Sequence, residues 1–153
     1  MRSLLQLGYR LRRLVLRLLR IRTLGVKVMV FNARGELLLI RNGYGDRSLF
    51  ALPGGGVKRS EPPEQAARRE VREETALDLQ RLSLLSTHYS TAEGKRDTVY
   101  LYSAIADGVP VADGLEVEEA RFFAVDRLPE RISPAALRRI EEHRAGTIAD
   151  GRW

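Results

Sequence analysis

The sequence predicts one domain of mixed α and β structure, and three observations support this fold class. The chain has 153 residues, with 44% hydrophobic and 30% charged residues, which is typical of a globular protein with one core. Segments that alternate apolar and polar residues predict strands, and apolar residues three and four apart predict helices. Because the two patterns are interspersed along the chain, we expect an α/β (α+β) fold with a mixed sheet.

Residues 1–22 are predicted to form a basic amphipathic helix that precedes the main domain of residues 23–153. Their apolar residues recur three and four positions apart, as on one face of a helix. The segment also holds seven arginines and no acid, which leaves 19 basic against 20 acidic residues in the main domain. Nucleic-acid binding by the main domain is therefore not favoured. The apolar face consists of Leu4, Leu7, Leu11, Leu14, Leu18 and Ile21.

Three roles stay open for this helix. The first is packing on its own domain or pairing with a second copy of the chain in a homodimer. The second, less favoured, is binding to an anionic membrane surface. The third is an arginine-rich mitochondrial leader, if the source is eukaryotic. No apolar run is long enough to cross a bilayer, and the lack of cysteine fits a reducing cytoplasm.

The main domain begins with a predicted hairpin. Valines alternate with other residues over 26–30, residues 32–35 have turn chemistry, and the apolar segment 36–41 is expected to be the returning strand. Near the end of the chain, Ser133 and Pro134 are typical of a helix start, and this helix is expected to run to about Arg144. Further strands are predicted over residues 79–90, 98–105 and 118–125.

A helix predicted over residues 64–74 carries three glutamates on one face. Glu70, Glu73 and Glu74 occupy positions i, i+3 and i+4, so their carboxylates converge. Interleaved arginines can form ion pairs worth only about 0.2–0.5 kcal/mol each. Carboxylate oxygens clustered without His or Cys favour Mg²⁺ or Mn²⁺ over zinc. The cluster is thus either a solvated face of intrahelical ion pairs or a site for divalent cations.

A spaced set of residues surrounds this helix: Gly55, Glu61, Arg69, Glu70, Val71, Glu73, Glu74 and Leu77. The set resembles the signature of the Nudix hydrolases, Gx5Ex7REUxEExGU, in which U is a bulky aliphatic residue. Eight of the nine specified positions match, and Ala76 stands where the family has glycine. The resemblance covers roughly residues 23–129, because a preceding LPGGGV and a later EEARFF occur at family-like distances.

The resemblance implies a Nudix-like α/β/α sandwich and a pyrophosphohydrolase that acts on acid anhydrides. Its substrate would be a nucleoside diphosphate linked to another moiety, and its cofactor Mg²⁺ or Mn²⁺. Glu70, Glu73 and Glu74 would be catalytic metal ligands, although Glu70 could instead orient or deprotonate the attacking water. The alternative is a non-catalytic Nudix-like binding module that engages a partner through residues 1–22. Retention of all three glutamates favours the enzyme.

Other roles follow from the same resemblance. Glu116 is the preferred additional metal ligand, whereas Glu118 and Glu119 are expected to lie in a solvated acidic loop. Arg41 and Arg96 are weaker candidates for contact with substrate phosphates. Ser60 is the candidate cap of the glutamate helix, and Ala76 would cost about 1 kcal/mol if its backbone were left-handed. Structural support of the site is expected from Gly55, Gly56 and an ion pair between Glu61 and Arg69.

Overall fold

The computed structural model describes residues 22–90 and 96–153, with side chains from residues 23–90 and 97–153. The helix expected over residues 1–22 lies outside this range, except that Arg22 begins the first strand. Within the described part of the chain, no helix is long and apolar enough to span a membrane. The elements are β1 (Arg22–Phe31), β2 (Leu37–Asn42), β3 (Phe50–Ala51), α2 (Pro63–Thr75), β4 (Gln80–Ser90), β5 (Arg96–Ile105), β6 (Val117–Phe123), α3 (Pro134–Ala145) and β7 (Gly151–Arg152).

The strands form one mixed sheet in the order β3-β2-β1-β5-β4-β7, and β6 pairs with β2. β1 and β5 are parallel and stay in register from Arg22 opposite Arg96 to Phe31 opposite Ile105. β4 and β7 are also parallel, whereas the other pairs are antiparallel. The predicted mixed sheet is therefore confirmed. The sequence did not indicate which strands would be parallel.

On the edge that faces away from β5, the first half of β1 pairs with a loop instead of a regular strand. β1 and β2 share only the register pair Phe31 and Leu37, next to the turn that joins them. On the same strand, the N–H of Val26 donates to the carbonyl of Gly55 at 2.9 Å. The N–H of Val28 likewise donates to the carbonyl of Pro53 at 3.0 Å. These bonds hold the glycine-rich loop, residues 52–57, alongside β1.

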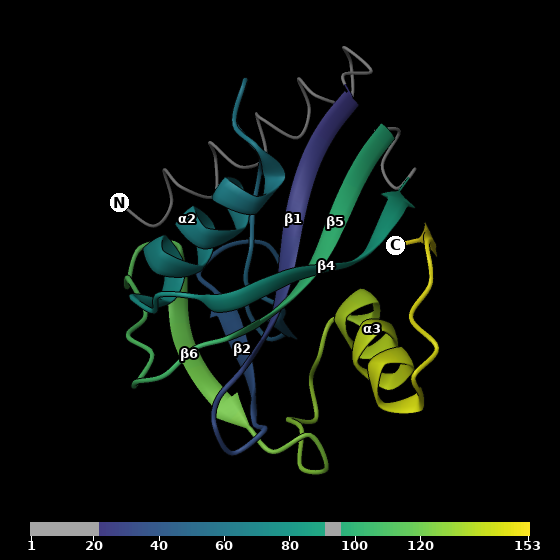
Figure 1. The fold of residues 1–153 in the computed structure, drawn as a ribbon. Helices are drawn as coiled ribbons and strands as arrows, with labels where there is room; N and C mark the ends of the chain where they lie inside the picture. Colours follow the sequence, from purple (N-terminus) through teal and green to yellow (C-terminus); the bar gives the residue numbers. More distant parts are fainter. Residues whose placement is uncertain (1–21, 91–95) are drawn as a thin grey trace.

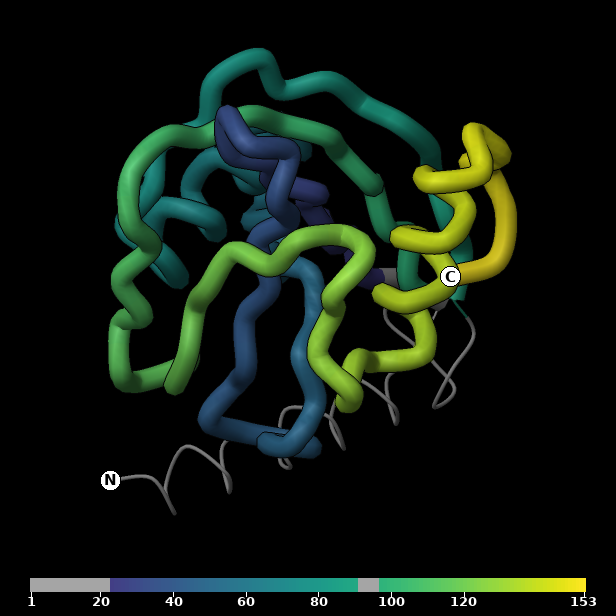
Figure 2. The backbone as a smooth tube through the Cα atoms, turned by 90° about the horizontal axis from the view of Figure 1, so that it is seen from below, coloured from purple at the N-terminus to yellow at the C-terminus, as the bar shows by residue number. Residues whose placement is uncertain are grey.

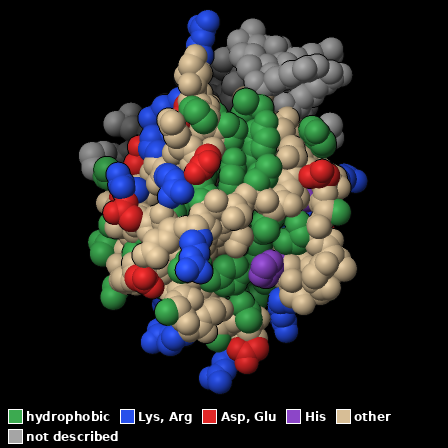
Figure 3. All heavy atoms as spheres, in the orientation of Figure 1, with side chains coloured by type: hydrophobic (Ala, Val, Ile, Leu, Met, Phe, Trp, Pro, Cys, Tyr) green, Lys and Arg blue, Asp and Glu red, His purple; other side chains and the backbone are tan. Residues whose placement is uncertain are grey.

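The two helices cover opposite faces of the sheet. Side chains of a strand alternate between its two faces, and on β1 Val26 and Val28 pack with Val71 of α2. Met29 points to the other face and packs with Ile140 of α3. Figure 1 shows the two helices on either side of the strands. The described residues thus form the expected α/β/α sandwich. In the space-filling view of the same side, hydrophobic side chains reach the surface over β1 and β5 (Figure 3).

The chain end packs against α3, where Arg139 donates to the carbonyl of Arg152 at 2.9 Å, and Figure 2 shows the two side by side. Arg139 donates to Nδ1 of His88 at 2.8 Å, and the other ring nitrogen contacts the hydroxyl of Ser86 at 2.7 Å. Because an arginine only donates, Nδ1 accepts and Nε2 carries the proton. Burial, together with the Arg139 charge, keeps the pKa of His88 below its ordinary value. The ring of Trp153 packs edge-on against His88. His88 therefore has a structural role.

Helix α2 ends in a left-handed residue. Ala76 has φ 58° and ψ 14°, and its N–H donates to the carbonyl of Arg72 at 2.9 Å. A residue with a Cβ is disfavoured in this conformation by about 1 kcal/mol relative to glycine. The family's preference for glycine at this position therefore has a backbone cause here.

Replacing Ala76 with glycine is expected to stabilise the protein by about 1 kcal/mol, because it relieves this backbone strain. Urea unfolding followed by circular dichroism measures the change. The matched control is Ala135→Gly inside α3, where the same substitution is expected to cost about 0.5–1 kcal/mol. Two changes of the same sign would contradict the interpretation.

Candidate active site

The glycine-rich loop meets the end of α2 through the carboxylate of Glu74. This side chain is buried, and it accepts a hydrogen bond from the N–H of Gly54 at 2.8 Å. Burial raises the pKa of Glu74 to about 7, although the Lys27 charge and the Gly54 bond oppose the shift. The negative charges of Glu70 and Glu116 add to it. Glu74 is thus a buried carboxylate whose charge is only partly compensated.

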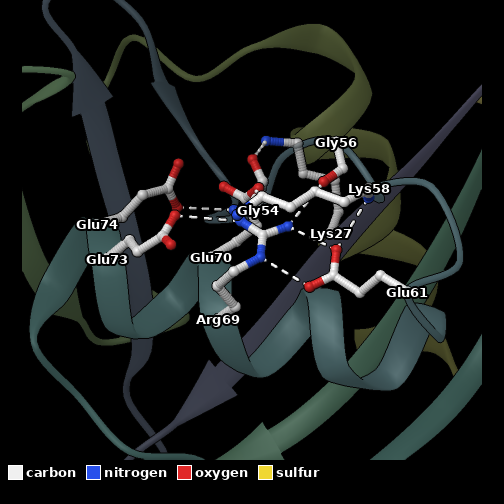
Figure 4. A network of polar contacts seen from close by, with 9 residues as sticks. All are labelled: Lys27, Gly54, Gly56, Lys58, Glu61, Arg69, Glu70, Glu73 and Glu74. Carbon is white, nitrogen blue, oxygen red and sulfur yellow. Dashed lines mark hydrogen bonds and ion pairs between the residues drawn. The ribbon is translucent and has the colours of Figure 1, made fainter.

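Arg69 lies at the centre of the helix face that carries the glutamates (Figure 4). Its Nε and one terminal nitrogen bind the two oxygens of Glu61 at 2.8 and 2.9 Å. The other terminal nitrogen contacts Glu70 at 2.7 Å and Glu73 at 3.1 Å. The terminal nitrogen that binds Glu61 also donates to the carbonyl of Gly56 at 3.0 Å. These contacts, Glu61 first, raise the pKa of Arg69 and tie the loop to the helix.

Two glycines of the loop allow a close approach that no larger residue permits. A Cβ at Gly55 would lie 2.4 Å from an oxygen of Glu70. A Cβ at Gly54, where φ is 133°, would lie 2.2 Å from the carbonyl oxygen of Val26. Both distances are far below van der Waals contact. The loop backbone can therefore lie directly against β1 and the Glu70 carboxylate only because these positions are glycine.

Glu116 lies near this carboxylate cluster although it comes from a different part of the chain. Its charge contributes to the raised pKa of Glu74. The side chain of Asp113 accepts the backbone N–H of Glu116 at 3.0 Å, which shapes the turn before β6. The carbonyl of Glu116 accepts the N–H of Gly43 at 2.8 Å, which joins this turn to the end of β2. The turn thus brings a fourth carboxylate to the vicinity of Glu74.

The donor set fits a hard divalent cation. The side chains that gather here offer carboxylate oxygens, which Mg²⁺ and Mn²⁺ prefer. Across residues 23–90 and 97–153, no three acidic or histidine side chains are arranged closely enough to enclose an ion as they stand. Arg69 accounts for part of this, because one of its nitrogens holds both Glu70 and Glu73.

Comparison with known proteins identifies the family. A model of the NUDIX domain matches residues 21–143. The chain belongs to the Nudix family. A candidate 8-oxo-dGTP diphosphatase of Bacillus subtilis is 32% identical over 124 residues, 81% of each chain. An ADP-ribose pyrophosphatase of Methanocaldococcus jannaschii is 36% identical over 96 residues, 61% of this chain and 57% of that protein. The crystal structure of a MutT Nudix hydrolase from Burkholderia pseudomallei superposes with a TM-score of 0.70, at 29% identity, over 79% of this chain and 97% of that one.

The protein is accordingly a Nudix hydrolase, an enzyme that acts on acid anhydrides. Its Nudix box coincides with the loop and helix described above, from Gly55 to Leu77. The start of the helix within this box differs from the prediction made from the sequence. The residue before α2 is Pro62, and no side chain caps this end of the helix. The prediction that Ser60 caps this helix was therefore wrong. Pro63 occupies the first turn, where its missing N–H costs nothing.

The acidic residues after Glu116 also differ from expectation. Glu118 and Glu119 are not in a solvated loop but on β6. Arg41 binds Glu118 at 2.9 Å and Glu119 at 3.3 Å, and Arg47 also contacts Glu118. Cross-strand register explains this arrangement, because Arg41 lies opposite Glu119 on the neighbouring strand. Contact of Arg41 with a substrate stays a prediction, and the side chain of Arg96 lies outside the described residues.

Lys27 is the residue of this site that sequence reasoning missed. It stands in β1 between the buried Val26 and Val28, and its ammonium donates to the carbonyls of Leu52 and Gly54, each at 2.9 Å. Burial lowers the pKa of Lys27, while the charges of the neighbouring glutamates counteract that shift. The available signal was a lysine within an otherwise apolar alternating strand, because a partly buried ammonium requires acceptors.

The ion pair of Glu61 and Arg69 predicts a measurable pH dependence of stability. Hydrogen bonds from Arg69, and then from the backbone of Lys58, lower the pKa of Glu61 from 4.5 to about 2. A carboxyl whose pKa is lower in the folded state stabilises the protein above its unfolded pKa. This stabilisation is lost as the pH falls from about 4.5 toward 2.

The variant Glu61→Gln should therefore be less stable than wild type at pH 6, and the difference should shrink as the pH is lowered. Urea unfolding from pH 6 to pH 3 measures it. The exposed Glu141→Gln on α3 is the control. A difference in unfolding free energy that did not change over this range would contradict the assignment.

Proposed function

We propose that this hydrolase splits the pyrophosphate bond of a nucleoside diphosphate linked to another moiety. In this proposal Glu70, Glu73, Glu74 and Glu116 hold Mg²⁺ or Mn²⁺. The observation that carries it is the buried, only partly compensated carboxylate of Glu74 beside further carboxylates. Such a group costs free energy unless a cation or proton balances it. The activities named for the relatives, acting on 8-oxo-dGTP and ADP-ribose, support the pyrophosphate substrate.

The four carboxylates would contribute in different ways. The Gly54 amide fixes the Glu74 carboxylate, so this metal ligand would already be in place before an ion binds. Glu70 is confined against Gly55, which suits either metal binding or orientation of the attacking water. The side chain of Glu73 is 56% exposed, so it can adjust toward an arriving ion. Bound divalent ions would offset the phosphate charge and acidify a water.

Arg69 would change partners when the cation arrives. Its contacts with Glu70 and Glu73 use one terminal nitrogen, whereas its hold on Glu61 uses Nε and the other nitrogen. If Arg69 releases Glu70 and Glu73, its two hydrogen bonds to Glu61 therefore stay in place. In this way Arg69 supports the negatively charged site in the absence of metal and keeps the loop attached afterwards.

The substrate moiety and the cellular location belong to the same proposal. The named relatives act on a purine nucleoside triphosphate and on ADP-ribose, so nucleotides of both kinds are the first substrates to test. Arg41 and Arg96 are the proposed phosphate contacts outside the box, because guanidinium groups bind phosphate in a bidentate manner. A cytoplasmic location suits the absence of cysteine from the chain.

The variant Glu73→Gln is expected to lose hydrolytic activity by on the order of 100-fold, because it removes one ligand charge from the metal site. Release of phosphate or of a nucleoside monophosphate from a nucleotide panel, with and without Mg²⁺, measures this. The matched control Glu141→Gln changes an exposed glutamate of α3 and should keep wild-type activity.

Two results would contradict the proposal. One is hydrolysis that continues unchanged without divalent ions and in Glu73→Gln. The other is the absence of Mn²⁺ binding to the wild-type protein in calorimetry. The panel also identifies the substrate, because only nucleotides whose pyrophosphate is cleaved yield product.

We also propose that the helix predicted over residues 1–22 pairs with a second copy of the chain. Its support is the apolar face with basic flanks in the sequence. Deleting residues 1–21 should convert a dimer into a monomer, as judged by the mass found by light scattering, while Mn²⁺ binding by the remaining domain stays within about threefold of wild type. A truncated protein that still has the mass of a dimer would contradict pairing through this segment.

A further inference from the structure

Lys27 binds the glycine-rich loop, residues 52–57, at two residues just before the Nudix box. It is a residue of β1, and its two neighbours along the strand, Val26 and Val28, are buried in the core beneath α2. Its stem leaves the strand on the opposite face, and its ammonium binds the carbonyls of Leu52 and Gly54 at 2.9 Å each. Figure 4 shows the ammonium directed at Gly54. Hydrogen bonds from a charged donor are roughly twice as strong as those between neutral groups.

Gly54 is held from both of its peptide groups. Its carbonyl accepts from Lys27 at 2.9 Å, and its N–H donates to Glu74 at 2.8 Å. Its φ of 133° is in a region that other residues rarely adopt, and Val26 closes off the space where a side chain would go. Because glycine has little intrinsic preference for this conformation, the two bonds fix the orientation of its peptide planes.

The same contacts decide where two of the glutamates lie. Gly55 follows Gly54, and its backbone is the surface against which the Glu70 carboxylate rests. A rotation of the peptide between Gly54 and Gly55, whose carbonyl Lys27 binds, would shift this surface and, through the backbone of Gly54, disturb the amide that Glu74 accepts. Lys27 also brings a positive charge close enough to Glu74 and Glu70 to influence their electrostatics. It can thus act on both carboxylates without being a ligand of the metal.

We propose that Lys27 is a positioning residue of this hydrolase, whose ammonium fixes the loop peptide groups that hold the carboxylates of Glu74 and Glu70 in place for the metal. The catalytic part of this inference rests on the proposed function, but its structural part does not. Exchange of the amide hydrogen of Gly54 in metal-free protein therefore tests the structural part by itself.

In Lys27→Met, the Gly54 amide should exchange at least about tenfold faster than in wild type, because the peptide groups on either side of the one that carries this amide lose the ammonium that binds their carbonyls. NMR-detected exchange without metal or substrate measures it. The control Arg138→Met removes a cation from the exposed face of α3 and should leave this amide unchanged. Equal Gly54 exchange rates in Lys27→Met and wild type would overturn the proposal.

The catalytic part can be tested by restoring the ammonium chemically, because the chain contains no cysteine. In Lys27→Cys, kcat should fall about 10–100-fold with KM within about threefold of wild type, as for the loss of a residue that orients metal ligands. Alkylation with bromoethylamine rebuilds a side chain that ends in an ammonium. It should return kcat to within about threefold of wild type and restore protection of the Gly54 amide.

Alkylation of the same cysteine with iodoacetamide gives a neutral side chain of similar length and is the matched control. If both alkylated forms recover kcat equally, the charge of the ammonium is not required, and the proposal is overturned. If the ammonium restores Gly54 protection while wild type hydrolyses no nucleotide, the positioning of the loop is supported and the proposed function fails. Circular dichroism of each form, together with the exchange result for Lys27→Met, separates these outcomes from a loss of folding.

Discussion

The contact between the Gly54 amide and the buried Glu74 carboxylate is the constraint on which the rest of the site depends. It joins the loop, which runs along β1, to the last turn of α2, which packs over the same strand. A side chain at Gly54 would clash with the backbone of Val26, and one at Gly55 would clash with the Glu70 carboxylate, so the loop can take this place only with glycine at both positions. The order of the sheet therefore matters for chemistry. A β1 that paired fully with β2 would have no free edge to hold this loop.

Charge balance explains why so many ionic side chains gather around one helix. Four glutamates would repel one another strongly in a partly buried place. Among the described residues, Arg69 and Lys27 bring positive charge to this cluster, and they have different tasks. The Arg69 guanidinium neutralises the exposed side of the cluster and can release part of its hold. The Lys27 ammonium offsets the negative charge on the buried side of the cluster and stays bound to backbone carbonyls. A divalent ion would complete the balance that these residues leave unfinished.

The sequence predicted the elements of the fold well, because their signals are local. The proline and serine that start α3 and the valine alternation of β1 are visible within a few residues. Non-local facts were out of reach. The parallel pairing of β1 with β5 and the ion pairs of Arg41 depend on strand register, which no single segment encodes. For the site, spacing placed the glutamates on one face. The spacing could not show that one nitrogen of Arg69 binds both Glu70 and Glu73.

The long parallel ladder between β1 and β5 has a consequence for how the chain is made. Arg22 must meet Arg96, so the first strand has no regular partner along most of its length until the fifth has been synthesised. Contacts between segments so distant in sequence slow folding, since a large loop must close before they form. A nascent chain on the ribosome therefore carries a valine-rich strand whose β5 edge stays open until residues 96–105 have emerged.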